Sequence, residues 1–182
     1  IWKKLKDINP EINEKKKLIF INPNASKLIS IRKWPLEKYA KLVKRLVEDK
    51  DVFIAITGVS SEMPDAEFIT DYVKNNRVIN LTGKTTLREL IDLFNIGKIL
   101  ITNDSGPAHF ASLTGIHIVV FFGPETPELY RPLTGNCTVM YSNYACSPCV
   151  SAYNQRLSPC NDNLCLKSID VEKAYNVVKK FI

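Results

Sequence analysis

Residues 99–122 read ILITNDSGPAHFASLTGIHIVVFF and hold two short apolar runs on either side of a polar loop. The runs at 99–102 and 117–122 are typical of strands that are buried on both faces of a parallel sheet. Between them, a proline in the first turn and a glycine after the last predict a short helix over 107–114. A strand, a helix and a strand in this order predict a right-handed crossover between parallel strands.

The same alternation extends through most of the chain. Further apolar runs predict strands at 18–22, 52–56 and 78–81, and Cys137 begins a strand-like run. Helices are predicted from Pro35 to about Asp49, over about 65–75, from a Thr85/Thr86 cap with Glu89 as its reciprocal partner to about Phe94, and over about 171–181. The fold class is therefore α/β, a Rossmann-like parallel sheet flanked by helices.

Length and composition fit one domain. The chain has 182 residues, of which 45% are hydrophobic, and no apolar run approaches the ~18 residues of a membrane-spanning helix. The lysine-rich residues 1–17 are interpreted as a linker, interdomain segment or arriving helix outside the core, ahead of a domain over 18–182. Because the chain begins at Ile1 and has no signal peptide, we expect it to be a fragment of a longer protein.

The positive charge is concentrated at one end. Residues 1–50 hold 14 Lys and Arg against 6 Asp and Glu, although the whole chain has a net charge of only +6. A basic third can face phosphate, an anionic membrane surface or nucleic acid, or it can be a solvated surface. The chain has no aromatic RNA-binding strand, zinc-finger spacing or basic heptad arm, which argues against a nucleic-acid partner.

Four of the five cysteines lie within twenty residues. Cys146, Cys149, Cys160 and Cys165 have the spacing C-x2-C-x10-C-x4-C. The pattern partly matches a structural zinc site, and disulfides or thiols packed in a loop are the alternatives. A chain without a signal peptide is expected in a reducing compartment, which favours metal or free thiols.

Ligands of open parallel sheets bind outside the carboxyl ends of the strands, so the loops there carry the candidate site. The first such loop, 22–26, offers Asn22 and Ser26 and is followed by Arg32 and Lys33. Amides, a hydroxyl and two cations near a helix start suit a phosphate. The alternative interpretation is a loop with ordinary helix caps.

The second loop, 103–109, leads directly into a predicted helix. Gly106 permits a close approach of the backbone, and Ser105 with the following N–H groups can hold a diphosphate. Asp104 would repel phosphate unless it faces a sugar hydroxyl, a lysine or the backbone, and it can equally be a simple cap. His109 is either part of the site or a core histidine with its hydrogen bonds satisfied.

The remaining loops at this edge contain small residues. Gly123 follows the last core strand, while Thr57, Gly58 and Thr82 end two others. The chain contains no G-x-x-x-x-G-K-[ST], G-x-G-x-x-G or G-x-S-x-G motif, which excludes the common nucleotide and hydrolase signatures. The residues alone therefore predict a Rossmann-like domain that binds a phosphorylated ligand.

Four segments in order resemble glycosyltransferase family 9, the lipopolysaccharide heptosyltransferases. They are Asn22-Pro23-Asn24-Ala25-Ser26 with Arg32-Lys33-Trp34-Pro35, Leu81 to Leu90, Asn103 to His109, and Phe122-Gly123-Pro124. The resemblance implies the C-terminal, donor-binding half of a two-domain GT-B enzyme. This family transfers a heptose from a nucleotide diphosphate donor, typically ADP-heptose, to a lipopolysaccharide core acceptor, with inversion and without a metal.

The resemblance also implies roles for single residues. Residues 104–106 would hold the diphosphate and sugar, Glu62 would meet the nucleoside, and Thr82 would lie near the base or ribose. Arg32 stands where the family usually has a phosphate-binding Lys, with Lys33 as the adjacent alternative. The full donor-binding set is Asn22, Ser26, Arg32, Lys33, Thr57, Gly58, Glu62, Thr82, Asp104, Ser105, Gly106, His109 and Gly123. The enzyme would work on the cytoplasmic face of the inner membrane.

The chain also departs from the family. The catalytic base is expected in an N-terminal domain that is absent here, so this chain alone is expected to bind donor without turnover. Asn24 replaces a usual Gly, and some relatives use other sugars. The alternatives are a non-catalytic nucleotide-binding module or another GT-B enzyme such as an epimerase.

Overall fold

The computed structural model contains one six-stranded, wholly parallel sheet with the strand order β3-β2-β1-β4-β5-β6. It describes residues 1–182, except for the side chains at positions 27 and 28. The strands are β1 (Lys17–Asn22), β2 (Val52–Ile56), β3 (Val78–Asn80), β4 (Ile99–Asn103), β5 (His117–Phe122) and β6 (Cys137–Tyr141). This order is that of the doubly wound dinucleotide-binding folds, so the predicted fold class is confirmed.

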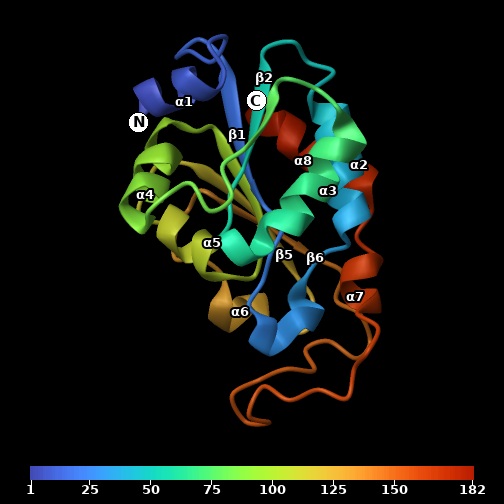
Figure 1. The fold of residues 1–182 in the computed structure, drawn as a ribbon. Coiled ribbons are helices and arrows are strands. Elements are labelled where there is room, and N and C mark those ends of the chain that lie inside the picture. The colour runs from blue at the N-terminus through green and yellow to red at the C-terminus, as the bar shows by residue number, and fades with distance from the viewer.

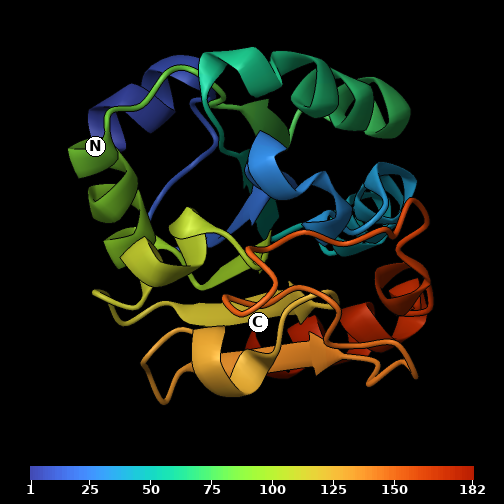
Figure 2. The same ribbon diagram turned by 90° about the horizontal axis from the view of Figure 1, so that it is seen from below.

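Helices cover both faces of the sheet (Figures 1 and 2). One face carries α2 (Leu36–Leu46), α3 (Met63–Val73), α7 (Leu164–Lys167) and α8 (Val171–Val178). The other carries α1 (Trp2–Ile8), α4 (Leu87–Ile96) and α5 (Gly106–Ala111). The short elements are α6 (Pro127–Tyr130) and the 3-10 helices η1 (Lys27–Arg32), η2 (Ser60–Glu62) and η3 (Lys179–Phe181).

Alternate side chains of each strand enter two separate cores. In β1, Ile19 and Ile21 pack with the α2 face, whereas Leu18 and Phe20 pack with the α1 and α4 face. All four are essentially inaccessible to solvent. A strand that is buried on both sides reads as a continuous apolar run, and this explains why the strands could be predicted from composition.

The strand order reverses between β1 and β4, which pair with each other while their following helices cover opposite faces. The loops after these two strands therefore separate and leave a crevice at the carboxyl edge of the sheet. This edge faces the viewer in Figure 2, where the segment 142–163 crosses in front of it. The crevice lies between Asn22 and Asn103, as the loop analysis predicts.

The predicted helix boundaries agree to within a few residues, and the cap of α4 is confirmed. Thr86 accepts a hydrogen bond from the backbone N–H of Glu89, whose carboxylate accepts one from the backbone N–H of Thr86.

The expectation that residues 1–17 lie outside the core is wrong, because Leu5 and Ile12 are fully buried against the α4 face. Leu5 comes from α1 and Ile12 from the loop after it, and the surrounding lysines concealed both. Within the described part of the chain, no helix has the length and apolarity to cross a bilayer.

Candidate functional site

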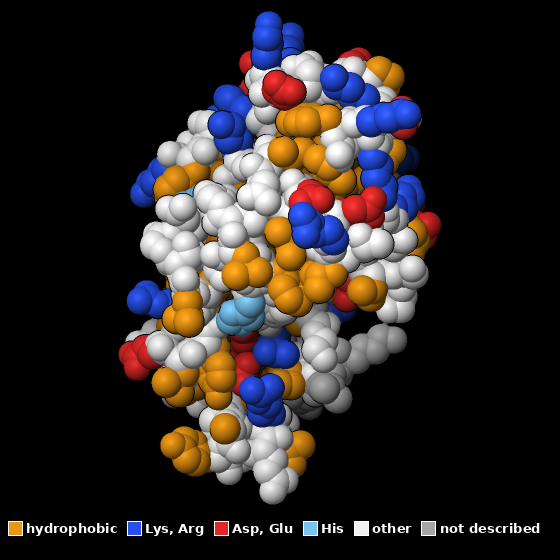
Figure 3. Space-filling model, turned by 90° about the vertical axis from the view of Figure 1, so that its left-hand side faces the viewer, with side chains coloured by type: hydrophobic (Ala, Val, Ile, Leu, Met, Phe, Trp, Pro, Cys, Tyr) orange, Lys and Arg blue, Asp and Glu red, His pale blue; other side chains and the backbone are white. Residues whose placement is uncertain are grey.

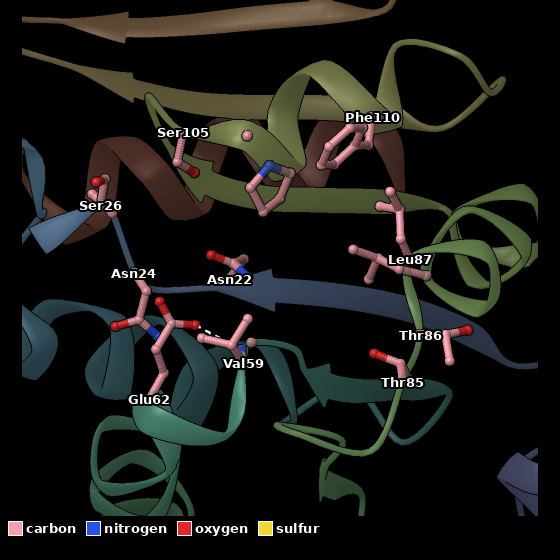
Figure 4. Close-up of a pocket in the computed structure, with 15 residues that line it drawn as sticks. Asn22, Asn24, Ser26, Val59, Glu62, Thr85, Thr86, Leu87, Ser105 and Phe110 are labelled. Carbon is pink, nitrogen blue, oxygen red and sulfur yellow. Dashed lines mark hydrogen bonds between the residues drawn. The ribbon is translucent and has the colours of Figure 1, made fainter.

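A cavity of about 280 Å³ occupies the crevice between the loops after β1 and β4 (Figure 4). The loop before α4 and the segment around η2 close its remaining sides. Its lining residues are Asn22, Asn24, Ala25, Ser26, Gly58, Val59, Glu62, Thr85, Thr86, Leu87, Leu90, Ser105, Gly106, Pro107 and Phe110. The site therefore draws on four loops that are far apart in the sequence.

The two ends of this first cavity differ in polarity. Leu87 and Phe110 lie toward one end, where Thr85 and Thr86 form the edge, and Ser26 and Ser105 lie at the other end (Figure 4). An apolar end suits a flat heterocycle, while hydroxyl and backbone groups suit a polar or charged portion of the same ligand. The gradient favours an elongated ligand with one apolar and one polar part.

A second, charged cavity of about 200 Å³ adjoins the polar end. The two cavities share Ser26, Ser105 and Gly106 as lining residues. The second cavity is further lined by Arg32, Asp104, His109, Glu125, Tyr130 and Arg156. Figure 3 shows this face, with apolar side chains gathered around a histidine and acidic and basic side chains directly below it.

Arg32 lies between two carboxylates in this charged cavity. Its Nη1 is 2.9 Å from Oε2 of Glu125 and 3.3 Å from Oδ2 of Asp104. Both acids are almost fully buried, and the Arg32 side chain is only 12% exposed. The second cation of the cavity, Arg156, is 52% exposed, and its Nε lies 3.7 Å from Oε1 of Glu125. Two acids that are buried with one well-shielded cation favour proton uptake by one of the acids.

The acid that takes up the proton is Asp104. Burial raises the pKa of Asp104 to about 7, and the interaction with Glu125 adds to this effect, while Arg32 opposes it. Asp104 is therefore easier to protonate than an ordinary aspartate. A protonated carboxyl tolerates a neighbouring phosphate, which resolves the repulsion that a charged aspartate would cause.

Lys33 is held differently from its neighbour Arg32. Its Nζ donates to Oδ1 of Asn24 at 3.0 Å and to Oδ2 of Asp65 at 3.1 Å. It lines a neighbouring hollow with Glu62, outside the two cavities described above. Of the two predicted phosphate cations, only Arg32 lines the charged cavity.

Buried hydrogen bonds fix the loop after β1. The side-chain amide of Asn103 donates to the carbonyl oxygens of Pro23 and Asn24, at 2.8 and 3.2 Å. Its oxygen accepts from the backbone N–H of Trp34 and from the Tyr39 hydroxyl. One fully buried side chain thus joins both walls of the crevice.

The segment after β2 forms the third wall. Oε2 of Glu62 accepts a hydrogen bond from the backbone N–H of Val59 at 2.9 Å, drawn as a dashed line in Figure 4. A Cβ on Gly58 would come within 2.6 Å of that same oxygen. The position must therefore be glycine if Glu62 is to hold this turn at the mouth of the cavity.

The structure brings together most of the predicted site residues. Asn22, Ser26, Gly58, Glu62, Ser105 and Gly106 line the first cavity, and Arg32, Asp104 and His109 line the second. His109 is exposed, so it is not a core histidine. Ser105, rather than Asp104, occupies the N-cap position of α5, and the cap interpretation of Asp104 is wrong.

Four predicted residues do not line either cavity, and Lys33, described above, is one of them. Thr57 and Thr82 are buried behind the wall, and a Cβ on Gly123 would meet Cys165 and Leu166 at 2.8 Å. Gly123 is therefore glycine because of the packing around it.

The sequence did not predict three residues of the cavities. Leu87 and Phe110 are brought together only by the fold. Glu125 could have been predicted, because it is an acid in a Gly-Pro turn at this edge of the sheet.

The cysteines do not assemble into a ligand set. All five are free thiols, and among the residues that the structure describes, no three or more His, Cys, Asp or Glu side chains are grouped to hold a metal ion. The four candidate zinc ligands Cys146, Cys149, Cys160 and Cys165 are distributed between the 142–163 segment and α7. Cys165 is buried, whereas Cys146 is exposed.

The sequence profile of glycosyltransferase family 9 (heptosyltransferase) matches residues 2–158. Lipooligosaccharide heptosyltransferase 2 of Campylobacter jejuni subsp. jejuni serotype O:6 is 30% identical over 180 residues, which cover 97% of this chain and 55% of that protein. The chain thus spans about half the length of the curated relatives that match nearly all of it.

Solved structures show the same fold. The ADP-heptose lipopolysaccharide heptosyltransferase II of Escherichia coli superposes with a TM-score of 0.76 at 21% identity, over 98% of this chain and 50% of that one. The iron-containing dodecameric heptosyltransferase TibC of enterotoxigenic E. coli, in complex with ADP-D-beta-D-heptose, gives 0.67 at 15% identity, over 96% and 47%. This chain therefore has the fold of one half of a GT-B glycosyltransferase.

Proposed function

The chain belongs to glycosyltransferase family 9, and on that premise we propose that it is the donor-binding half of a heptosyltransferase. The donor is a nucleotide diphosphate sugar of the ADP-heptose type, and the acceptor is the core of a lipopolysaccharide. The whole enzyme requires a second, N-terminal domain that binds the acceptor and contributes the base. Residues 1–17 lead from that domain into this one.

The observation that carries this proposal is the pair of adjoining cavities at the switch point of the sheet. The first cavity has an apolar end at Leu87 and Phe110 that suits adenine. The shared wall at Ser26, Ser105 and Gly106 suits the diphosphate, and the charged cavity beyond it suits the sugar. The order base, diphosphate, sugar matches the order of polarity along the crevice.

In the proposed reaction, the acceptor oxygen attacks the anomeric carbon from the face opposite the diphosphate. The bond from that carbon to the donor phosphate breaks, the configuration inverts, and negative charge grows on the departing diphosphate. Arg32 stabilises this charge from the wall of the cavity, where its low exposure limits screening by water. The base in the other domain removes the proton of the acceptor hydroxyl.

The requirement for Arg32 has a structural consequence. Because Arg32 is paired with Glu125 and Asp104, a diphosphate must compete with two carboxylates for one guanidinium. Protonation of Asp104 leaves Glu125 as the only charged carboxylate that competes with the diphosphate for Arg32. The raised pKa of Asp104, about 7, favours this protonation. The cation supplies the charge stabilisation, so the proposed transfer needs no metal cofactor.

The basic N-terminal third supports a location at the cytoplasmic face of the inner membrane. It carries 14 basic against 6 acidic residues, and anionic lipids attract such segments by about 1 kcal/mol per basic residue. The proposed acceptor is anchored in that membrane. Binding of the chain to anionic vesicles that weakens steeply with salt would support this part of the proposal.

The test of the donor assignment is calorimetric titration of this chain with ADP, UDP and GDP at matched ionic strength. We expect ADP to bind most tightly and Arg32→Ala to weaken that binding. Tighter binding of UDP or GDP would be compatible with a glycosyltransferase but would contradict the proposal that the donor is an ADP-sugar. Absence of binding by all three would contradict the proposal that this half holds the donor by itself.

A further inference from the structure

Glu125 has a fully buried side-chain oxygen that lacks a hydrogen-bond partner among the described residues. Its side chain is only 2% exposed. Oε2 accepts from Arg32, whereas Oε1 is buried and accepts no hydrogen bond from a described residue while Asp104 is ionised. Nε of Arg156 lies 3.7 Å from Oε1, which is too long for a hydrogen bond.

We propose that Glu125 is a sugar-binding residue whose Oε1 accepts hydrogen bonds from hydroxyl groups of the donor sugar. This inference rests on the proposed function, because it assumes that the charged cavity receives the sugar portion of a nucleotide sugar. It adds a second carboxylate, from the loop after β5, to the site that the loops after β1 and β4 form.

The chemistry of the side chain selects the ligand group. A carboxylate only accepts hydrogen bonds, and so do the oxygens of a diphosphate diester, so Glu125 and phosphate repel each other. Hydroxyl groups can donate to Oε1 without adding charge. A buried carboxylate oxygen without a donor costs free energy, and a bound hydroxyl removes that cost. The cavity with Glu125 is therefore suited to the neutral, hydroxyl-bearing part of the donor.

The backbone around Glu125 is fixed from outside the crevice. The carbonyl oxygen of Pro124 accepts hydrogen bonds from the backbone N–H groups of Cys149 and Val150, at 2.8 and 2.9 Å. The Val150 side chain is 1% exposed, so this contact is anchored in the interior. Because its backbone is held in place, the Glu125 side chain can discriminate between sugars whose hydroxyl groups differ in position.

The experiment compares ADP with ADP-heptose in calorimetric titrations of this chain. The variants are Glu125→Gln, which keeps the shape, and Glu125→Thr, which keeps one acceptor but shortens the side chain. Glu128→Gln is the matched control, since it removes the same charge from an exposed position three residues away. Far-UV circular dichroism and urea unfolding establish that each variant is folded at the temperature of the titration.

We expect the wild-type chain to bind ADP-heptose more tightly than ADP. In both Glu125 variants this advantage falls by about 10-fold or more, as expected for the loss of a hydrogen bond to a charged group. Affinity for ADP changes no more than it does in Glu128→Gln, or it rises because Arg32 is released.

Other outcomes overturn the inference in distinguishable ways. An equal loss for ADP and ADP-heptose would mean that Glu125 only positions Arg32. An unchanged preference in the variants would mean that the sugar lies elsewhere, and an absent preference in the wild-type chain would exclude sugar recognition here without any variant. If the wild-type chain bound neither ligand, the proposed function itself would fail.

Discussion

The side-chain oxygen of Asn103 lies 2.8 Å from the backbone nitrogen of Trp34, 69 residues earlier in the chain. Asn103 ends β4, whereas Trp34 begins the turn into α2, on the other wall of the crevice. The same oxygen accepts from the Tyr39 hydroxyl at 3.1 Å, and burial raises the pKa of Tyr39, which keeps this hydroxyl a neutral donor. The side-chain amide of Asn103 therefore holds the two walls of the crevice together.

Replacing this amide should destabilise the fold strongly. Asn103→Ala leaves two buried carbonyl oxygens and two buried donors without their partner. We expect the free energy of unfolding to fall by about 2–4 kcal/mol, because unsatisfied buried polar groups cost about 1–3 kcal/mol each and water replaces some of the bonds. Urea unfolding measures this loss.

The control for Asn103 is Asn95→Ala on the exposed side of α4. Asn95 makes one side-chain hydrogen bond, to Ile91, and its loss should change stability by less than about 0.5 kcal/mol. If Asn103→Ala were as mild as Asn95→Ala, the loop after β1 would hold its shape without this amide.

Arg32 and Lys33 should differ in their effect on nucleotide binding. Arg32→Ala should weaken ADP binding by about 10-fold or more, because a charge-assisted hydrogen bond contributes about 1.5–3 kcal/mol. Lys33→Ala should have a smaller effect, since Lys33 binds Asn24 and Asp65. Titration calorimetry of both variants decides between them. A larger loss in Lys33→Ala would assign the phosphate to the hollow beside Asp65.

Sequence analysis could predict the loops of the site but not the pairing within it. The runs at 18–22 and 99–102 identified β1 and β4, and a parallel sheet fixes where their loops meet. The pair of Arg32 and Glu125 joins residues 93 positions apart, and nothing local records it. Side-chain pairing across loops depends on the packing of both, which a linear pattern does not contain.

The missed elements share a cause. The helix offered as one interpretation of residues 1–17 is present as α1, but only Leu5 and Ile12 of this segment are completely buried, which gave little sign of its packing into the core. The apolar end of the first cavity combines Leu87 of α4 with Phe110 of α5. Each side chain is exposed on its own helix, and only their proximity gives them a role.

The stability of the chain should depend on pH through Asp104. The fold raises the pKa of Asp104 from 3.8 to about 7, so the native state keeps a proton that the unfolded chain releases. Its contribution to stability is therefore largest near pH 4 and is lost as the pH rises toward 7. Asp104→Asn should remove this loss. The midpoints of urea unfolding of the wild-type chain and of Asp104→Asn, measured near pH 4 and above pH 7, give the size of this loss. If both proteins changed in stability equally with pH, Asp104 would not be the group responsible.

Phe110 should contribute to binding of the base rather than the phosphates. Phe110→Ala removes part of the apolar end of the cavity, and we expect ADP affinity to fall by about 10-fold, given about 1.5–3 kcal/mol for a buried large apolar contact. The affinity for inorganic pyrophosphate, which has no base, should be unchanged in this variant. Leu113→Ala is the control, because Leu113 is an exposed leucine that does not line the cavity. Equal losses for ADP and pyrophosphate would place the base elsewhere.

The thiols should react with iodoacetamide in an order set by burial. Cys146 is exposed and should be alkylated first. Cys165 should be last, because it is 4% exposed and burial raises its pKa, which lowers the fraction of reactive thiolate. Cys137 should also be slow, since burial raises its pKa too.

Peptide mapping by mass spectrometry after timed alkylation gives this order, and the unfolded chain, in which all five thiols react, is the control. A bound metal would produce a different pattern. Cys146, Cys149, Cys160 and Cys165 would then be protected together and would become reactive together on addition of a chelator. That result would contradict the separate thiols of the structure and restore the zinc interpretation of the C-x2-C-x10-C-x4-C spacing.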